Sequence, residues 1–148
     1  MLSAAEISRV LWMAAHPDDV DYAAAGTVAD LTGRGVQVSY CVITDGQAGE
    51  ADGVPRDQVP ALRQQEQRRA AQLVGVSDLS FLGYPDGALT PNFELRRDLA
   101  AVIRRLRPDV VITHSPQRNL DRLFGGQALA AGFADGRLAE AFRRVVTG

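Results

Sequence analysis

The sequence predicts an α/β fold in three layers, with a four-stranded parallel sheet in the order 3-2-1-4 and helices on both faces. Short apolar runs alternate with helix-length segments along the chain, which is the pattern of βαβ units. The most unusual polar residues follow the first strand, which places that strand centrally with the fourth beside it. A length of 148 residues, with 46% hydrophobic and 23% charged residues, fits one globular domain.

The first half of the chain supplies two strands, a helix and a long loop. Residues 9–15 (RVLWMAA) form a short apolar run that predicts a buried strand. Residues 22–34 carry apolar side chains at positions 24, 28 and 31, the spacing of one helix face. Residues 36–44 (VQVSYCVIT) are β-branched and apolar and predict the second strand. Residues 45–60 are rich in Gly, Asp and Pro and predict a long loop, which in compact domains is often functional.

The second half repeats the alternation. Residues 61–74 predict a helix that Gly75 ends, and residues 79–82 predict a short strand. Residues 93–106 have the clearest helical stripe, with apolar positions 95, 99, 102, 103 and 106 and Asn92 as the N-cap. Residues 109–113 (DVVIT) predict the fourth strand. The arrangement as a whole is Rossmann-like.

The rest of the chain, residues 115–148, has a weaker pattern. A loop precedes a stretch in which Leu138, Phe142, Val145 and Val146 fit one face of a helix. We expect one domain over residues 1–148, with a divergent tail from residue 124.

Composition argues against several classes of partner. Eighteen acidic and sixteen basic residues give a net charge of -2, so no basic excess is available for a nucleic-acid backbone. No apolar run approaches the ~18 residues of a membrane span. Glu6 and Arg9 interrupt any signal-peptide apolar region, which makes a cytoplasmic location the expectation. Cys41, the one cysteine, lies in a strand-like run and is expected to be buried and inert.

Candidate functional residues gather where the predicted strands end. The carboxyl ends of parallel strands meet at one edge of the sheet, where ligands of open α/β sheets bind. His16 and His114, the two histidines of the sequence, follow the first and fourth strands, and Asp86 lies in the turn after the third. A histidine at a strand end is often only a polar loop residue, but two beside several carboxylates favour a site.

The turn after the first strand reads His16-Pro17-Asp18-Asp19. Its two carboxylates would repel a dinucleotide phosphate and attract a divalent cation. His16 and Asp19 are ligand types that suit Zn²⁺, and their spacing allows a tight turn to aim both at one point. Asp18 would then be available as a base for water on the metal. The simpler alternative is that one of the aspartates caps the following helix.

These residues also resemble a known family, the zinc-dependent N-acetylglucosaminyl deacetylases of the LmbE-like, PIG-L type. Five motifs agree in order over about residues 9–123. They are Ala15-His16-Pro17-Asp18-Asp19, Ile43-Thr44-Asp45-Gly46-Gln47-Ala48-Gly49-Glu50, Leu62-Arg63-Gln64-Gln65-Glu66, Leu82-Gly83-Tyr84-Pro85-Asp86-Gly87 and Pro108-Asp109-Val110-Val111-Ile112-Thr113-His114. The resemblance implies a metal-dependent hydrolase that removes the N-acetyl group from a small N-acetylglucosaminyl conjugate.

The resemblance also implies roles for individual residues. His16 and Asp19 would hold Zn²⁺, Asp18 would be the general base, and Arg63 and Asp86 would help to hold the sugar. His114 stays open between a substrate contact, a third zinc ligand and a polar loop residue. From the residues alone, Arg63 could equally be an ordinary exposed helix residue and Asp86 could merely serve its turn.

Two departures from the family bear on activity. Val20 stands where the family usually has Glu, and no histidine follows His114, where the family has an HPDH-type motif that supplies the third zinc ligand. The resemblance thus predicts a deacetylase impaired by loss of one ligand. The alternative is a catalytically inactive remnant that binds metal or a sugar conjugate without turnover.

Overall fold

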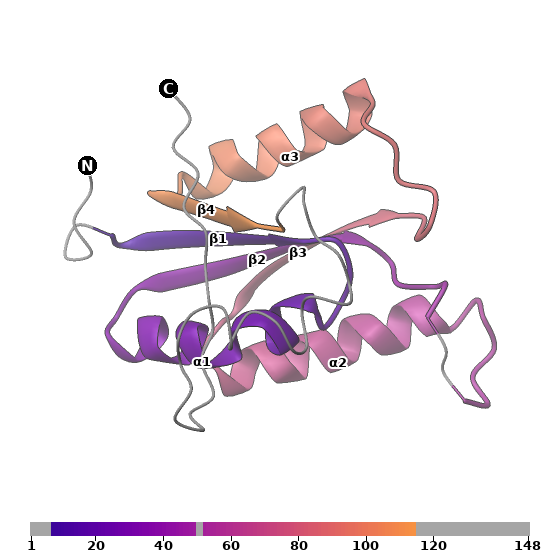
Figure 1. Ribbon diagram of the computed structural model, residues 1–148, viewed down its shortest axis with the longest axis horizontal. Helices are drawn as coiled ribbons and strands as arrows, with labels where there is room; N and C mark the ends of the chain where they lie inside the picture. The colour runs from indigo at the N-terminus through magenta and orange to yellow at the C-terminus, as the bar shows by residue number, and fades with distance from the viewer. Residues whose placement is uncertain (1–6, 50–51, 115–148) are drawn as a thin grey trace, which may run out of the picture. The chain divides into compact units, whose positions relative to one another are not determined.

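The computed structural model describes residues 7–49 and 52–114 (Figure 1). Within them the strands pair in parallel in the order β3-β2-β1-β4, so the predicted fold class and strand order are confirmed. The elements are β1 (Arg9–Ala14), α1 (Asp19–Gly33), β2 (Gln37–Thr44), α2 (Val59–Leu73), β3 (Asp78–Tyr84), α3 (Phe93–Leu106) and β4 (Val110–Thr113).

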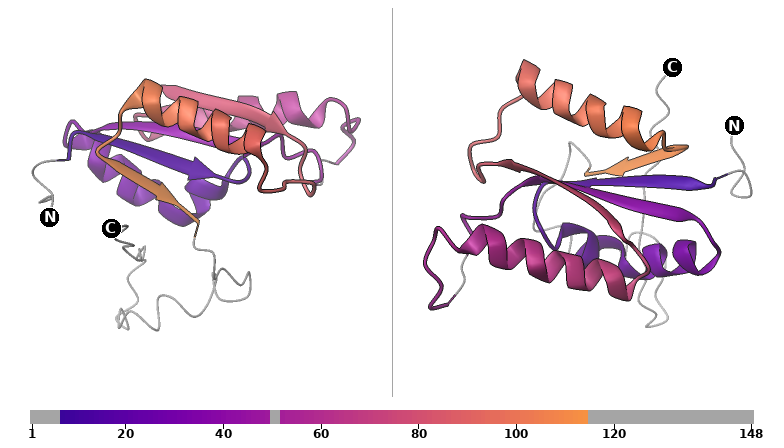
Figure 2. Two further views of the ribbon diagram at one scale, coloured as in Figure 1. Left: turned by 90° about the horizontal axis from the view of Figure 1, so that it is seen from above. Right: turned by 180° about the vertical axis from the view of Figure 1, so that it is seen from behind.

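The sheet lies between two helical layers, with α1 and α2 on one face and α3 on the other (Figures 1 and 2). Alternate residues of β1 fill the two cores because side chains of a strand alternate between faces. Val10, Trp12 and Ala14 pack in one cluster, and Leu11 and Met13 pack in the other. Burial of both faces explains why β1 reads as a continuous apolar run.

Cys41 belongs to the core on the α3 side and has no exposed surface, as predicted. Burial disfavours the thiolate and raises the pKa of its thiol to about 11, although Arg105 acts in the opposite direction. The thiol is therefore protonated at neutral pH, consistent with a structural role.

Two helices begin earlier than the apolar spacing predicts. α1 begins at Asp19 rather than residue 22, because Val20 extends the buried stripe and the Asp19 and Asp21 carboxylates suit the positive end of the helix. α2 begins at Val59 rather than residue 61, and Pro60 lies in its first turn, where a missing N–H costs nothing.

The remaining boundaries are close to prediction. β3 continues two residues past Leu82 because Gly83 adopts a positive φ of 72° at an irregularity in the pairing with β2. α3 has the predicted bounds, and Asn92 caps it by accepting a hydrogen bond from the Leu95 N–H at 2.8 Å. Ile103, expected in the buried stripe, is instead 39% exposed.

Residues up to Thr113 belong to one compact unit, and residues 114–148 are assigned to a second. The expected tail helix lies outside the described residues, and the single-domain expectation stays a prediction. Within residues 7–49 and 52–114, no helix is long and apolar enough to cross a membrane. The cytoplasmic location likewise stays a prediction.

Candidate functional site

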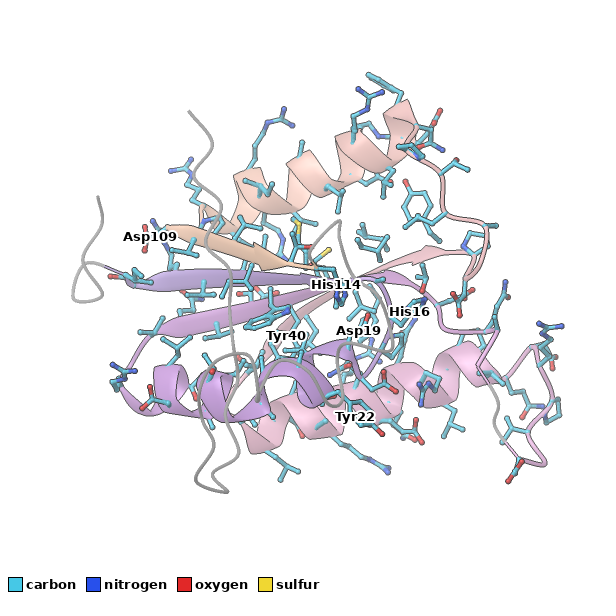
Figure 3. All side chains as sticks on the ribbon, viewed as in Figure 1. His16, Asp19, Tyr22, Tyr40, Asp109 and His114 are labelled. Atoms are coloured by element: carbon cyan, nitrogen blue, oxygen red, sulfur yellow. The ribbon has the colours of Figure 1, made fainter. Side chains whose placement is uncertain are left out.

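The carboxyl ends of three strands are tied together by hydrogen bonds around the first turn. The backbone N–H and the hydroxyl of Thr44, at the end of β2, both donate to the Ala15 carbonyl at 2.8 Å. The Asp45 N–H donates to the Tyr84 carbonyl at the end of β3 at 3.0 Å. These bonds fix the direction in which the chain leaves β1, and therefore where His16 begins (Figure 3).

His16 lies between two carboxylates. Its Nε2 is 2.9 Å from Asp86 Oδ1, and its Nδ1 is 3.4 Å from Asp19 Oδ2. The same Asp19 oxygen accepts the His16 backbone N–H at 2.8 Å, which closes the turn. An ionised carboxylate has no proton to give, so the Nε2–Asp86 bond requires the proton on Nε2. When the ring is neutral with its proton on Nε2, Nδ1 is the nitrogen left to bind a metal ion.

This pair fits a divalent cation. Two ligands at ~2.1 Å from tetrahedral zinc are roughly 3.4 Å apart, which is the observed separation of Nδ1 and Oδ2. If His16 bound a metal, its contact with Asp86 would be of the kind by which a carboxylate commonly orients a metal-binding histidine. Among the described residues, no group of three or more His, Cys, Asp or Glu side chains is arranged to hold a metal.

Asp18 is held by α2 in an unusual backbone conformation. Its φ of 76° is left-handed, which costs a residue with a Cβ roughly 1–2 kcal/mol. Arg63 Nη2 donates to Asp18 Oδ2 at 2.7 Å, and the Asp18 N–H donates to Gln67 Oε1 at 2.5 Å. Asp18 is the N-cap residue of α1, yet its side chain makes no cap hydrogen bond. The capping alternative therefore does not account for Asp18.

Gly46 brings the loop after β2 against this turn. Its φ is +68°, and a Cβ added there would lie 3.1 Å from the Pro17 Cδ. Both the left-handed backbone and the close approach to Pro17 therefore favour glycine at this position. The next residue, Gln47, donates its N–H to Asp45 Oδ1 at 3.0 Å, which tightens the same turn.

Asp21 extends the polar network below Asp18. Gln67 Nε2 donates to Asp21 Oδ2 at 3.1 Å. Burial raises the pKa of Asp21, the Gln67 hydrogen bond lowers it, and the nearby charge of Asp18 raises it. Asp21 is thus an acid whose ionisation is sensitive to its neighbours, one turn along α1 from Asp18.

The structure brings together most of the residues selected from the sequence. His16 lies with Asp19 and Asp86, and Asp18 lies with Arg63. His114 directly follows β4 but begins the second unit, so its role stays a prediction. Gln67 was missed by sequence reasoning. Its signal was its place four residues after Arg63, on the helix face shared with buried Val59 and Ala71.

The fold and site together define a class, an α/β protein with a His–Asp pair and a further carboxylate at the carboxyl edge of its parallel sheet. The chain belongs to the GlcNAc-PI de-N-acetylase family (PIG-L), whose profile matches residues 11–123.

Several relatives within this family carry names that describe an activity. A diacetylchitobiose deacetylase from Thermococcus kodakarensis is 35% identical over 112 residues, which is 75% of this chain and 42% of that protein. A probable N-acetyl-alpha-D-glucosaminyl L-malate deacetylase 2 from Bacillus anthracis is 39% identical over 114 residues, 72% of this chain and 50% of that protein. This chain therefore spans about half the length of the curated relatives it matches.

Solved structures agree on the fold. The N,N'-diacetylchitobiose deacetylase of Pyrococcus horikoshii superposes with a TM-score of 0.69 at 33% identity, covering 72% of this chain and 40% of that one. A 4-carboxy-2-hydroxymuconate hydratase from Pseudomonas putida superposes with a TM-score of 0.67 at 23% identity, covering 76% and 50%. The second likeness shows the fold alone, and its different chemistry means that function must be argued from the site.

Proposed function

We propose that this chain is a zinc-dependent hydrolase that removes the N-acetyl group from a small N-acetylglucosaminyl conjugate. The observation that carries the proposal is the His16 Nδ1–Asp19 Oδ2 separation of 3.4 Å, with Nε2 held by Asp86. Membership of the family and the named deacetylases among its relatives support the reaction class. They do not favour an inactive remnant.

Zinc, when bound by His16 and Asp19, would polarise the amide carbonyl and make water a stronger acid. Asp18 is the group in this chain suited to take the proton from that water. Arg63 occupies its Oδ2, so Oδ1 is the oxygen that would accept the proton, and it would later pass the proton to the leaving amine. The hydrogen bond from Arg63 would keep the Asp18 carboxylate in one orientation while the base is needed.

Asp86 and Arg63 have a second role in this proposal. Each is bonded to a residue of the first turn, and each lies at the sheet edge where a sugar would enter. We propose that the sugar hydroxyls contact these two side chains, with His114 as a further contact.

The test is acetate release by the purified full chain with added zinc. Suitable substrates are diacetylchitobiose and N-acetylglucosaminyl conjugates of malate and inositol. Because a catalytic zinc takes three protein ligands and the described ranges supply two, we expect turnover slower than about 1 per second. Asp18→Asn should reduce that rate by at least about 100-fold, and exposed Asp57→Asn should not change it. Acetate release that is independent of zinc, or no release by zinc-loaded protein, would contradict the proposal.

A further inference from the structure

The buried amide of Gln67, a residue of α2, contacts the turn that follows β1. Gln67 is 2% exposed and lies near the middle of α2. Fully buried glutamine is uncommon in a core and needs partners for both ends of its amide. Here the oxygen accepts the Asp18 N–H at 2.5 Å and the nitrogen donates to Asp21 Oδ2 at 3.1 Å.

The chemistry of the partners fixes the orientation of this amide. A backbone N–H can only donate, so Oε1 faces Asp18. A carboxylate can only accept, so Nε2 faces Asp21. Rotating the amide by half a turn would oppose two donors at one end and two acceptors at the other. Gln67 therefore works as a directional bridge between Asp18, the N-cap residue of α1, and Asp21 in the first turn of that helix.

One end of the bridge is Asp18, whose backbone is in the left-handed region. Asp18 is one of two described non-glycine residues with a positive φ, the other being Arg107 at the end of α3. Left-handed conformations persist where surrounding contacts impose them, and they concentrate at functional sites. The Gln67 oxygen supplies such a contact, because it binds an N–H whose direction is set by that φ.

Gln67 acts together with Arg63. The two residues are four apart on α2 and so lie on one face of the helix. Arg63 binds the Asp18 carboxylate, and Gln67 binds the Asp18 backbone. Asp18, Arg63 and Gln67 line one pocket between α1 and α2. Both contacts end on Asp18, the proposed general base.

We infer that Gln67 is a positioning residue, which holds Asp18 in its left-handed conformation through the bridge to Asp21 and so directs the Asp18 carboxylate. The backbone effect stands by itself, whereas the effect on turnover rests on the proposed function. Loss of the bridge should let Asp18 relax toward other backbone conformations, while β1 and the His16–Asp19 pair keep their geometry.

The experiment compares Gln67→Met with Gln65→Met in the full chain. Gln65 lies on the same helix and is exposed, so the control removes the same groups without touching the turn. Amide hydrogen exchange measured by NMR should show the Asp18 N–H at least tenfold less protected in Gln67→Met, with the amide of Leu11 in β1 unchanged. Zinc affinity should change less than threefold. Where turnover is measurable, kcat should fall with little change in KM.

A second variant separates positioning from loss of the fold. Gln67→Glu combined with Asp21→Asn keeps both ends of the bridge. One oxygen of the new carboxylate can accept the Asp18 N–H and the other can accept from the new amide at position 21, so protection of the Asp18 N–H should return to within about threefold of the parent. Unchanged Asp18 exchange in Gln67→Met would overturn the inference. So would an equal loss at Asp18 and Leu11, or failure of the double variant to restore protection. A parent without deacetylase activity would count against the proposed function but leave the exchange result valid.

Discussion

Two aspartates at opposite ends of β1 make similar backbone contacts and yet differ in chemistry (Figure 3). At the amino end, Asp109 Oδ2 accepts the N–H groups of Ser8 and Arg9 at 2.9 and 2.8 Å, and the Arg9 guanidinium lies 3.6 Å from Oδ1. At the carboxyl end, Asp19 Oδ2 accepts the His16 N–H and also faces His16 Nδ1. Each carboxylate ties the chain at one end of the strand.

The difference lies in what surrounds the negative charge. Donors and a cation surround Asp109, and the bonds from Ser8 and then Arg9 hold the pKa of its carboxyl below the usual range. Asp19 instead lies 3.4 Å from His16 Nδ1, and the opposite ring nitrogen contacts Asp86. Asp109 therefore ties together two strands, whereas Asp19 is one of the two residues that we propose as zinc ligands.

The strongest break of this comparison is His16→Ala. It removes one of the two proposed zinc ligands. Zinc affinity should therefore fall by more than ~100-fold, the most that loss of a residue hydrogen-bonded to a ligand typically costs. Asp109→Ala, at the opposite end of the strand, should bind zinc as the parent does. Zinc content and titration of both variants measure the difference. Equal affinity in His16→Ala and the parent would remove His16 as a ligand.

Asp86→Ala tests which of two roles Asp86 has at the carboxyl end of β1. If Asp86 orients the His16 ring, its loss should weaken zinc binding by about 10–100-fold, because the ring and its proton are no longer fixed. If Asp86 only holds the sugar, zinc affinity will stay the same and KM alone will rise. Isothermal titration with zinc, beside the KM for an N-acetylated substrate, distinguishes these two roles.

Asp109 gives the smallest effect, and it depends on pH. Because the folded pKa is below the unfolded value, the folded state binds fewer protons, and the stabilisation is present above the ordinary aspartate pKa. It is lost as the pH falls through the lowered folded value. The urea midpoint of the parent should therefore drop more between pH 5 and pH 2.5 than that of Asp109→Asn. Asp57→Asn, in an exposed segment, should behave as the parent, and an identical acid dependence in all three proteins would refute this.

The amino-acid pattern was sufficient to predict the fold, and it placed His16 beside Asp19 at the candidate site. Alternating apolar runs and turn residues predicted every strand of the described sheet, because a parallel sheet buried on both faces leaves a strong local signal. His16 and Asp19 were visible because they share one turn. The contacts of Asp86 and Gln67 were not, because they join segments 70 and 49 residues apart in the sequence, and periodicity carries no information about which distant side chains meet.

That separation has a thermodynamic consequence. The bond between His16 and Asp86 closes a span of 70 residues, so the arrangement that suits a cation does not exist in the unfolded chain. Any ion that binds there acts as a ligand of the folded state alone, and mass action then adds to the free energy of unfolding. At a free concentration 100 times the dissociation constant, the gain would be about 2.7 kcal/mol. Metal supply would in this way set how much of the chain is folded as well as what chemistry it performs.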